Sequence, residues 1–368
     1  MCLLCTYYNI YEYHPLYLIV IPIFNKNKQK LAEKTIYWIF SEISFIITYR
    51  VILKGERRMP LDPHIQIFLN QYNEMPRPSL EDVTPPQLRE MEKMSLTPSK
   101  EAVKKVYNKE IELNERTLTI RVYEPEGTGP FPALVYYHGG GWVLGSLDSH
   151  DSICRSYANE SNCIVVSVDY RLAPEYKFPA GVNDAYDALD WISAHASQLN
   201  IDSNKIAVGG DSAGGNLAAV VSILAKERQG PSIVHQLLIY PSVGFKNQHP
   251  ASMKENAEGY FLSKDLMNWF RLQYLNNKEE EQHPYNAPVL LEDLSSLPSA
   301  TIITAQYDPL RDSGKDYADT LKNHGVPVTY ENYETMIHGF FGFHEFVPLA
   351  QQAINKSAAQ LRQVFDSI

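Results

Sequence analysis

One short segment, residues 210–214 with the sequence GDSAG, constrains the fold of this chain more than any other. It follows the apolar run of residues 205–209, which has the composition of a buried strand, and it precedes residues 216–228, which have the apolar spacing of a helix. Small residues on both sides of Ser212 permit a sharp turn between the two elements, and such a turn places the serine on a crest. The segment predicts an α/β chain with an accessible serine; a glycine-rich turn with an inert serine is the alternative.

Seven further segments have the pattern of strands. Two of them, residues 102–113 and 118–123, alternate apolar and polar residues and predict an antiparallel pair at the edge of a sheet. The others are short and mostly apolar, and helical patterns such as residues 183–197 separate them, which is typical of a buried parallel sheet. Together with the strand before Ser212, these later strands are predicted at residues 133–137, 164–169, 205–209, 235–240, 301–304 and 328–333.

Two regions depart from this alternation of strands and helices. The first, residues 60–95, contains two short helical patterns, and the second of these starts with a capping-box sequence at residues 84–87. The other region is a connection of sixty residues, 241–300, between two predicted strands, which is far longer than a crossover helix requires. We expect a cap formed from about residues 60–95 and an insertion within about residues 243–298.

A second glycine-rich segment, residues 138–142 with the sequence HGGGW, follows a predicted strand. Glycines allow backbone N–H groups to turn toward one point, where they can stabilise a negatively charged oxygen during a reaction. We expect the amides of Gly139, Gly140 and Ala213 to form this oxyanion hole. His138 is expected to order the loop rather than to transfer protons. A phosphate-binding loop is the alternative, but this segment lacks the GKS, GKT and GxGxxG sequences of such loops.

A nucleophilic serine needs a base, and the base needs an orienting acid. Among the histidines after Ser212, His338 lies just past a late predicted strand, where active sites collect in parallel sheets, and His344 is the runner-up. Asp308 follows the preceding strand and is the expected acid, with Asp312 as its competitor. The order Ser, Asp, His along the chain is that of α/β-hydrolases.

These segments together resemble the bacterial hormone-sensitive-lipase family of carboxylesterases, and most closely its thermophilic members. The resemblance runs from about Met59 to the C-terminal helix. It implies an α/β-hydrolase fold, with an eight-stranded, mostly parallel sheet flanked by helices and a helical cap. It also implies that residues 170–175 support the oxyanion loop, with Arg171 and Glu175 as the charges of that segment. The matching segments are residues 138–142, 170–175, 210–215, 308–310 and 338–340.

The sequence therefore predicts a serine carboxylesterase that hydrolyses short- to medium-chain esters through an acyl-enzyme. In this prediction Ser212 attacks the ester carbonyl, His338 carries the proton to the leaving group, and Asp308 holds the imidazole. No cofactor and no metal is expected. The residues expected to support this site without taking part in the chemistry are His138, Gly141 and Asp211.

Four alternatives remain open at this stage. Two keep the chemistry and change the substrate: an amidase, or a lipase acting on long-chain triglycerides. A third is a ligand-binding receptor on the same fold, because a fold does not fix a function. The fourth is an esterase or lipase anchored to a membrane through the first residues of the chain.

Residues 1–58 differ in composition from the rest. They hold eight Lys/Arg and four Asp/Glu, a net charge of +4 that leaves −14 for the other residues. The apolar stretch of residues 36–53 is long enough to span a bilayer, but it contains Glu42 and Arg50, each costly at membrane depth. Residues 54–58 can be encoded by a purine run that contains AAGGAG, like a ribosome-binding site, directly before Met59. We expect residues 1–58 to be translated upstream sequence or disordered.

The overall charge and the cysteines bound the partners and the compartment. A net charge of −10 argues against a nucleic-acid-binding protein, which normally presents a basic face. Cys2 and Cys5 form a CxxC without a second pair, and Cys154 and Cys163 are expected to be buried thiols. This cysteine usage predicts a reducing compartment and so a cytoplasmic protein. The expected partner is a small-molecule ester, without nucleic acid or membrane, and the expected state is a monomer or homodimer.

Overall fold

The computed structural model describes residues 58–76, 79–247 and 249–368. The chain divides into two units, Met1–Met59 and Pro60–Ile368, and the elements below belong to the second. The expectations for residues 1–58, and for Cys2 and Cys5, concern a segment that lies outside the described residues apart from its last residue. Among the described helices, none is both long enough and apolar enough to cross a membrane.

Within the described residues, eight strands form one sheet in the order β1-β2-β4-β3-β5-β6-β7-β8. β2 pairs antiparallel with both β1 and β4, and every later pairing is parallel. The predicted eight-stranded, mostly parallel sheet with an antiparallel edge is confirmed. The strands are β1 (Lys105–Leu113), β2 (Arg116–Glu124), β3 (Phe131–Tyr137), β4 (Ile164–Val168), β5 (Ile201–Asp211), β6 (His235–Ile239), β7 (Ser299–Tyr307) and β8 (Val328–Ile337).

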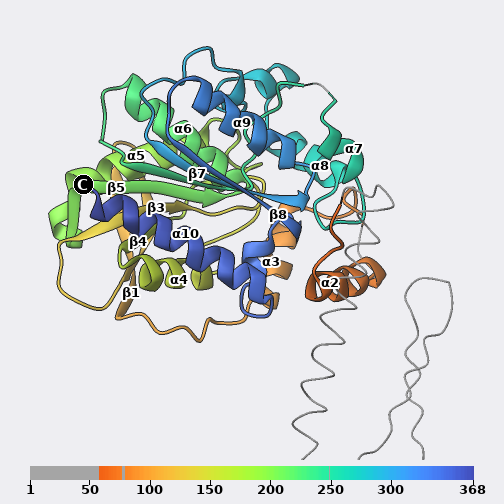
Figure 1. Cartoon of the computed structure of the whole chain (residues 1–368), viewed down its shortest axis with the longest axis horizontal. Coiled ribbons are helices and arrows are strands. Elements are labelled where there is room, and N and C mark those ends of the chain that lie inside the picture. Colours follow the sequence, from red (N-terminus) through yellow and green to blue (C-terminus); the bar gives the residue numbers. More distant parts are fainter. Residues whose placement is uncertain (1–57, 77–78, 248) are drawn as a thin grey trace, which may run out of the picture. The chain divides into compact units, whose positions relative to one another are not determined.

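Helices cover both faces of this sheet (Figure 1). One face packs against α4 (Asp151–Ser161) and α10 (Pro348–Asp366). The other face packs against α5 (Ala180–Ala194), α6 (Ala213–Glu227) and α9 (Arg311–Asn323). Because both faces are covered, the central strands are buried almost along their whole length, which explains why their sequences are mostly apolar.

The ends of several elements differ from the sequence prediction. α6 begins at Ala213 rather than at residue 216, because the helix follows the serine directly. α5 begins at Ala180 and ends at Ala194, where a 3₁₀ turn, Ala196–Leu199, continues the chain. β5 starts at Ile201, and the polar residues of its first half lie toward the exposed end of the sheet, where apolar patterning gives no signal.

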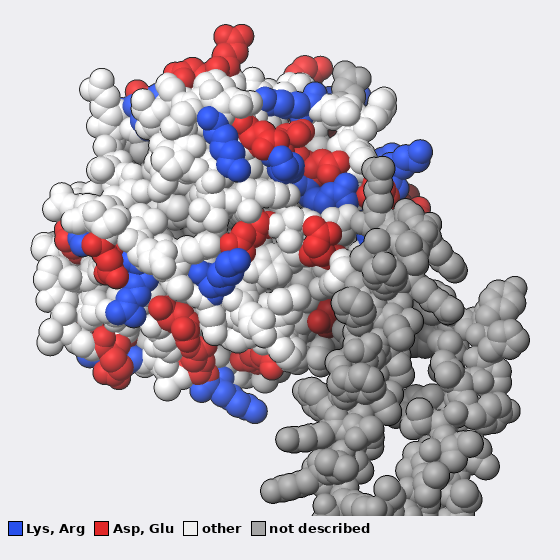
Figure 2. Space-filling view, in the orientation of Figure 1, with Lys and Arg blue, Asp and Glu red and all other residues white. Residues whose placement is uncertain are grey.

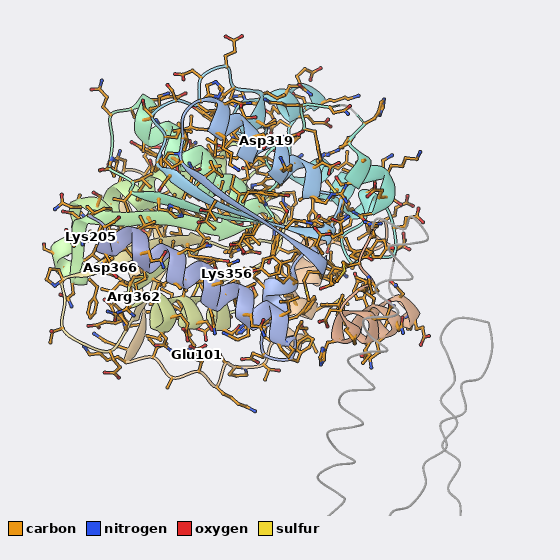
Figure 3. The ribbon with its side chains drawn as sticks, viewed as in Figure 1. Glu101, Lys205, Asp319, Lys356, Arg362 and Asp366 are labelled. Atoms are coloured by element: carbon orange, nitrogen blue, oxygen red, sulfur yellow. The ribbon has the colours of Figure 1, made fainter. Side chains whose placement is uncertain are left out.

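Two lysines link the C-terminal helix α10 to the sheet at the surface (Figure 3). Lys205 Nζ donates to the Phe365 carbonyl at 2.7 Å, and Lys356 forms an ion pair of 2.9 Å with Glu331 on β8. On the face that Figure 2 shows, acidic and basic side chains lie interspersed over the described part of the chain. Such exposed pairs each contribute little to stability, so the apolar contacts of α10 dominate its docking.

Two segments lie outside this layered core. The first holds α2 (Pro63–Glu74) and α3 (Pro85–Ser95), and α3 starts with the predicted capping box, since the Thr84 N–H donates to Gln87 Oε1 at 2.9 Å. The second holds α7 (Ala251–Glu255), α8 (Lys264–Tyr274) and two 3₁₀ turns, Lys278–Gln282 and Pro288–Leu290.

The two segments contact each other. Trp269 on α8 donates its indole N–H to the Leu80 carbonyl at 3.0 Å. The ring of Phe261 lies 5.7 Å from that of Phe68 and 5.1 Å from that of Tyr72, both on α2. Residues far apart in the sequence are therefore joined above the ends of the strands that carry the candidate site.

Candidate active site

The serine of the GDSAG segment lies in a strained turn between β5 and α6. Ser212 has φ 56° and ψ −114°, an unfavourable backbone conformation for a residue with a side chain. Its N–H donates to the Ile239 carbonyl at 2.8 Å, which fixes the turn to the next strand. A Cβ atom at Gly210 or Gly214 would collide with the Tyr137 carbonyl, so glycine is required at both positions. The close packing of backbone around Ser212 explains why small residues flank it.

A continuous line of hydrogen bonds joins Ser212 to His338 and Asp308. His338 Nε2 lies 2.9 Å from Ser212 Oγ, and His338 Nδ1 lies 2.8 Å from Asp308 Oδ2. Because a carboxylate only accepts, Nδ1 carries the proton and Nε2 is free to accept from the serine hydroxyl. The three residues directly follow the ends of β5, β8 and β7, so the parallel sheet itself brings them together.

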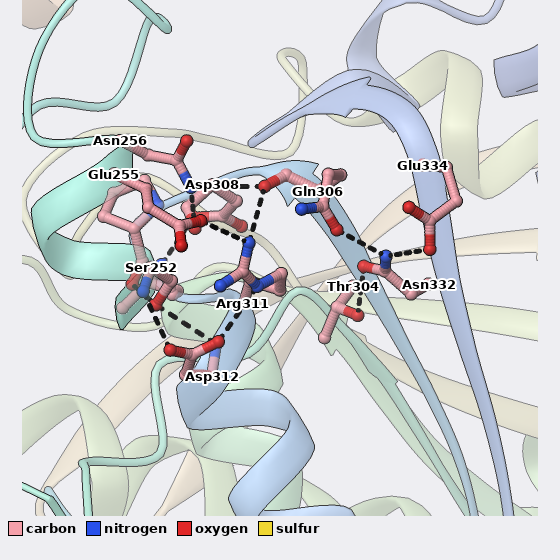
Figure 4. A network of polar contacts seen from close by, with 12 residues as sticks. Ser252, Glu255, Asn256, Thr304, Gln306, Asp308, Arg311, Asp312, Asn332 and Glu334 are labelled. Atoms are coloured by element: carbon pink, nitrogen blue, oxygen red, sulfur yellow. Dashed lines mark hydrogen bonds and ion pairs between the residues drawn. The ribbon is translucent and has the colours of Figure 1, made fainter. Parts of the chain in front are cut away.

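Asp308 is fully buried and held on several sides. Its Oδ1 accepts from the Leu310 N–H at 2.7 Å, which leaves Oδ2 directed at the imidazole. Asn256, just after α7, donates to the Asp308 carbonyl at 3.0 Å, and Ser252 donates to the Pro309 carbonyl at 2.8 Å (Figure 4). The acid is thus positioned by its own loop and by the segment that contains α7.

The two competitors that the sequence left open lie elsewhere. Asp312 accepts from the Ser252 N–H at 2.8 Å and from Arg311 Nε at 2.9 Å, so it anchors α7 rather than an imidazole (Figure 4). His344 is buried and its Nδ1 lies 2.8 Å from Gln351 Oε1 on α10. Within the described part of the chain, neither residue forms a hydrogen bond or ion pair with His338 or Ser212.

The three glycines of the HGGGW segment differ in how their N–H groups are bonded. The Gly139 N–H already donates to Asp211 Oδ1 at 3.0 Å, so it is not available to a substrate. Gly140 and Gly141 adopt φ values of 114° and 61° and line the cavity beside Ser212, and among the described residues their N–H groups have no acceptor. Ala213 N–H stands at the start of α6. The N–H groups of Gly140 and Gly141 are thus left open to the cavity, whereas the N–H of Gly139 is already bonded.

Asp211, which the sequence placed among the supporting residues, is the acceptor at the centre of this arrangement. Besides Gly139, its Oδ1 accepts from the Tyr136 hydroxyl at 2.9 Å, and His150 Nε2 lies 3.1 Å away. Burial alone would raise the pKa of Asp211, but the His150 charge and these hydrogen bonds hold it below its ordinary value. His150 was not among the residues predicted from the sequence. The position of Asp211 in a buried turn beside the serine could have indicated that its carboxylate needs a partner.

His138 holds the loop in a neutral form. Burial, followed by the charge of His150, lowers the pKa of His138 to about 3. Its Nδ1 donates to the Gly139 carbonyl at 2.8 Å, and its ring stacks on Tyr170 with the centroids 4.3 Å apart. The Tyr170 hydroxyl also donates to the His138 carbonyl at 2.8 Å. These contacts tie His138 to its own loop and to Tyr170, as expected of a residue that orders the loop.

The site opens into a cavity of about 2030 Å³. Ser212, His338 and the three glycines of the HGGGW segment line one part of it. Apolar side chains from the two outer segments line another part: Phe68, Tyr72, Leu88, Phe261, Leu266, Met267 and Phe270. Within the described residues, no group of three or more His, Cys, Asp or Glu side chains is arranged to hold a metal ion. The site is a hydrogen-bonded serine, histidine and aspartate beside a wide, largely apolar cavity.

The sequence profile of a family described as alpha/beta hydrolase fold matches residues 134–342. A carboxylesterase from Mycobacterium tuberculosis is 42% identical over 266 residues, covering 69% of this chain and 83% of that protein. An arylesterase from Saccharolobus solfataricus is 37% identical over 290 residues, covering 77% and 93%. The solved structure of an esterase from Pyrobaculum calidifontis, 41% identical, covers 83% of this chain and 99% of its own, with a TM-score of 0.77.

Proposed function

The chain belongs to the α/β-hydrolase family, and from this premise we propose that Ser212, His338 and Asp308 are the catalytic triad of a serine carboxylesterase. The observation that carries the proposal is the hydrogen-bond line from Ser212 Oγ through the imidazole to the buried carboxylate. The resemblance to the carboxylesterases of the hormone-sensitive-lipase family is confirmed, and the similar proteins include a thermophilic archaeal esterase.

In the proposed reaction, Ser212 Oγ attacks the ester carbonyl while His338 Nε2 accepts the hydroxyl proton. The carbonyl oxygen becomes an oxyanion, which accepts from the N–H groups of Gly140, Gly141 and Ala213. His338 then gives the proton to the leaving alkoxide as the C–O bond breaks, and an acyl-enzyme remains. A water molecule attacks the acyl group with His338 again as base, which releases the acid and restores the serine.

The cap is part of the same proposal. We infer that residues 60–95 and 243–298 together cover the site, because side chains of both line one cavity and the two segments contact each other. Their apolar side chains offer a binding surface for the acyl chain or the alcohol of an ester. An unreactive receptor on this fold is disfavoured, since serine, base and acid are all present and bonded to one another.

The proposal also includes the cellular compartment and the oligomeric state of the protein. A cytoplasmic location is supported by Cys154 and Cys163, which are both buried free thiols. The expected oligomeric state is a monomer or homodimer. Burial raises the pKa of the Cys163 thiol to about 12, so it stays protonated and unreactive at neutral pH. An analytical ultracentrifugation run on the purified chain would decide between monomer and homodimer.

We expect kcat/KM on p-nitrophenyl esters to rise from acetyl to about hexanoyl or octanoyl and then to fall. Each CH₂ group buried in the apolar cavity contributes up to about 0.8 kcal/mol, or about fourfold, until the space for the chain is filled. The measurement is a panel of esters of graded length at one pH, with p-nitroanilides and an emulsified long-chain triglyceride alongside. A steady fall from acetyl onward, or faster hydrolysis of the anilides or the emulsion, would contradict this substrate class.

A further inference from the structure

Helix α3 places two opposite charges, one turn apart, against the backbone of the oxyanion loop. Arg89 Nε donates to the Val143 carbonyl at 2.7 Å. Glu92 Oε2 accepts from the Gly145 N–H at 3.0 Å. Residues three positions apart lie on the same side of a helix, so one face of α3 contacts the loop with both a donor and an acceptor. The cationic side chain thus bonds to a carbonyl oxygen, and the anionic side chain bonds to an N–H group.

The part of the loop that these side chains hold is the turn that carries the proposed oxyanion donors. The Gly140 carbonyl accepts from the N–H groups of Val143 and Leu144, at 3.1 and 2.8 Å, so residues 140–144 form one compact turn. Val143 and Gly145 lie at the far end of that turn from Gly140. A side chain that fixes this end therefore limits how the N–H groups at the near end can rotate.

Arg89 also ties the loop to a second support. Its Nη2 donates to the Ala173 carbonyl at 2.6 Å, and its guanidinium makes two hydrogen bonds to Glu175, of 2.9 and 2.8 Å. The hydrogen bonds from Arg89 hold the pKa of Glu175 below its ordinary value, so the carboxylate stays charged at neutral pH. The Ala173 N–H in turn donates to the Trp142 carbonyl at 2.9 Å. Arg89 is thus bonded directly to the oxyanion loop. It is also bonded to residues 173–175, which contact the same loop through Trp142.

From these contacts we propose that Arg89 and Glu92 are positioning residues for the oxyanion hole. They fix the backbone of residues 140–145 through Val143 and Gly145, so that the donors stand in place before the substrate reacts. Donors that are already oriented need no rearrangement in the transition state, and this preorganisation is where such groups lower the barrier. The inference rests on the function proposed above, because it assigns these residues to the same reaction.

Arg89→Gln tests the inference through the transition state rather than through stability alone. We expect kcat on p-nitrophenyl butyrate to fall by about 10- to 100-fold while KM changes by less than about threefold. The loss of kcat should be smaller than that caused by removing an oxyanion donor completely, because here the donor is only misplaced. The Ki of an alkyl trifluoromethyl ketone, which forms a tetrahedral adduct with serine, should rise by a similar factor. Arg89→Lys keeps the charge but not the two-pronged geometry of the guanidinium. Its kcat and ketone Ki should lie between those of the wild type and those of Arg89→Gln.

A matched pair at Glu92 tests the second contact without touching the first. Glu92→Gln keeps an acceptor for the Gly145 N–H and should retain most of kcat, whereas Glu92→Ala removes the acceptor and should lower kcat by about tenfold. Glu90→Ala is the control, because Glu90 is exposed on the same helix. The melting temperature of every variant is measured, so that a loss of kcat in a folded protein is recognised as such.

Two results would overturn the inference. One is an Arg89→Gln or Glu92→Ala enzyme that keeps the wild-type kcat and ketone Ki. The other is a loss confined to KM or to the melting temperature, which would mean that the contacts only dock the helix. Failure of the proposed function has a different signature, namely hydrolysis that survives Ser212→Ala. The two failures can therefore be told apart in the same set of assays.

Discussion

Ser212→Ala should lower kcat on a p-nitrophenyl ester by about 10³- to 10⁶-fold and leave the fold intact. The alanine variant retains the cavity and the oxyanion donors, so the remaining rate comes from binding and charge stabilisation alone. His338 keeps its bond to Asp308 but has no hydroxyl to deprotonate. The measurement is kcat of the purified variant beside wild-type protein, with the circular dichroism spectrum and melting temperature of both.

Covalent labelling supplies an independent reading of the same residue. A p-nitrophenyl phosphonate should modify the wild-type chain once, and peptide mass spectrometry should place the label on Ser212. Ser242→Ala is the matched control, because Ser242 also lines the cavity but has no contact with the imidazole among the described residues. Modification of another serine, or an alanine variant at 212 that keeps most of its rate, would remove Ser212 from the role of nucleophile.

The three residues of the proposed triad could be picked out from the sequence because each directly follows a strand. Ser212 was marked by its glycines, and His338 and Asp308 by their places after the last two strands of the sheet. In a parallel sheet the ends of neighbouring strands meet at one edge, so sequence order translates into proximity. His344 and Asp312 had similar neighbours in the sequence, and only the packing of α10 and α7 shows that each is bonded elsewhere.

The proposed oxyanion donors differ from those expected from the sequence, because the sequence does not show which N–H groups are already bonded. Three glycines in a row are equivalent in the sequence, and which N–H is free depends on where the Asp211 carboxylate lies. Arg89 and Glu92 were missed because they stand about fifty residues before the loop they contact, in a region without a recognisable motif. Contacts of this kind depend on the docking of a helix, which neither apolar spacing nor capping sequence specifies.

Asp308→Asn should lower kcat by about 10⁴-fold, through the tautomer of the base. In the wild-type chain the carboxylate Oδ2 accepts from His338 Nδ1–H, which leaves Nε2 as the acceptor for the serine proton. An asparagine amide turned toward the ring would donate to Nδ1 and move the ring proton to Nε2. Nε2 could then no longer accept, although the shape of the side chain is almost unchanged. Stopped assays with micromolar enzyme make a rate of this size measurable.

Asp312→Asn is the matched control variant for this prediction. Both aspartates are buried or half-buried near the end of β7, and both contact the segment containing α7, but the structure gives only Asp308 a bond to His338. We expect Asp312→Asn to change kcat by less than about tenfold, since an amide oxygen can still accept from the Ser252 N–H. A larger loss at Asp312 than at Asp308, with both proteins folded, would mean that the orienting acid has been misassigned. Equal and small losses at both would mean that the imidazole keeps its tautomer without a carboxylate.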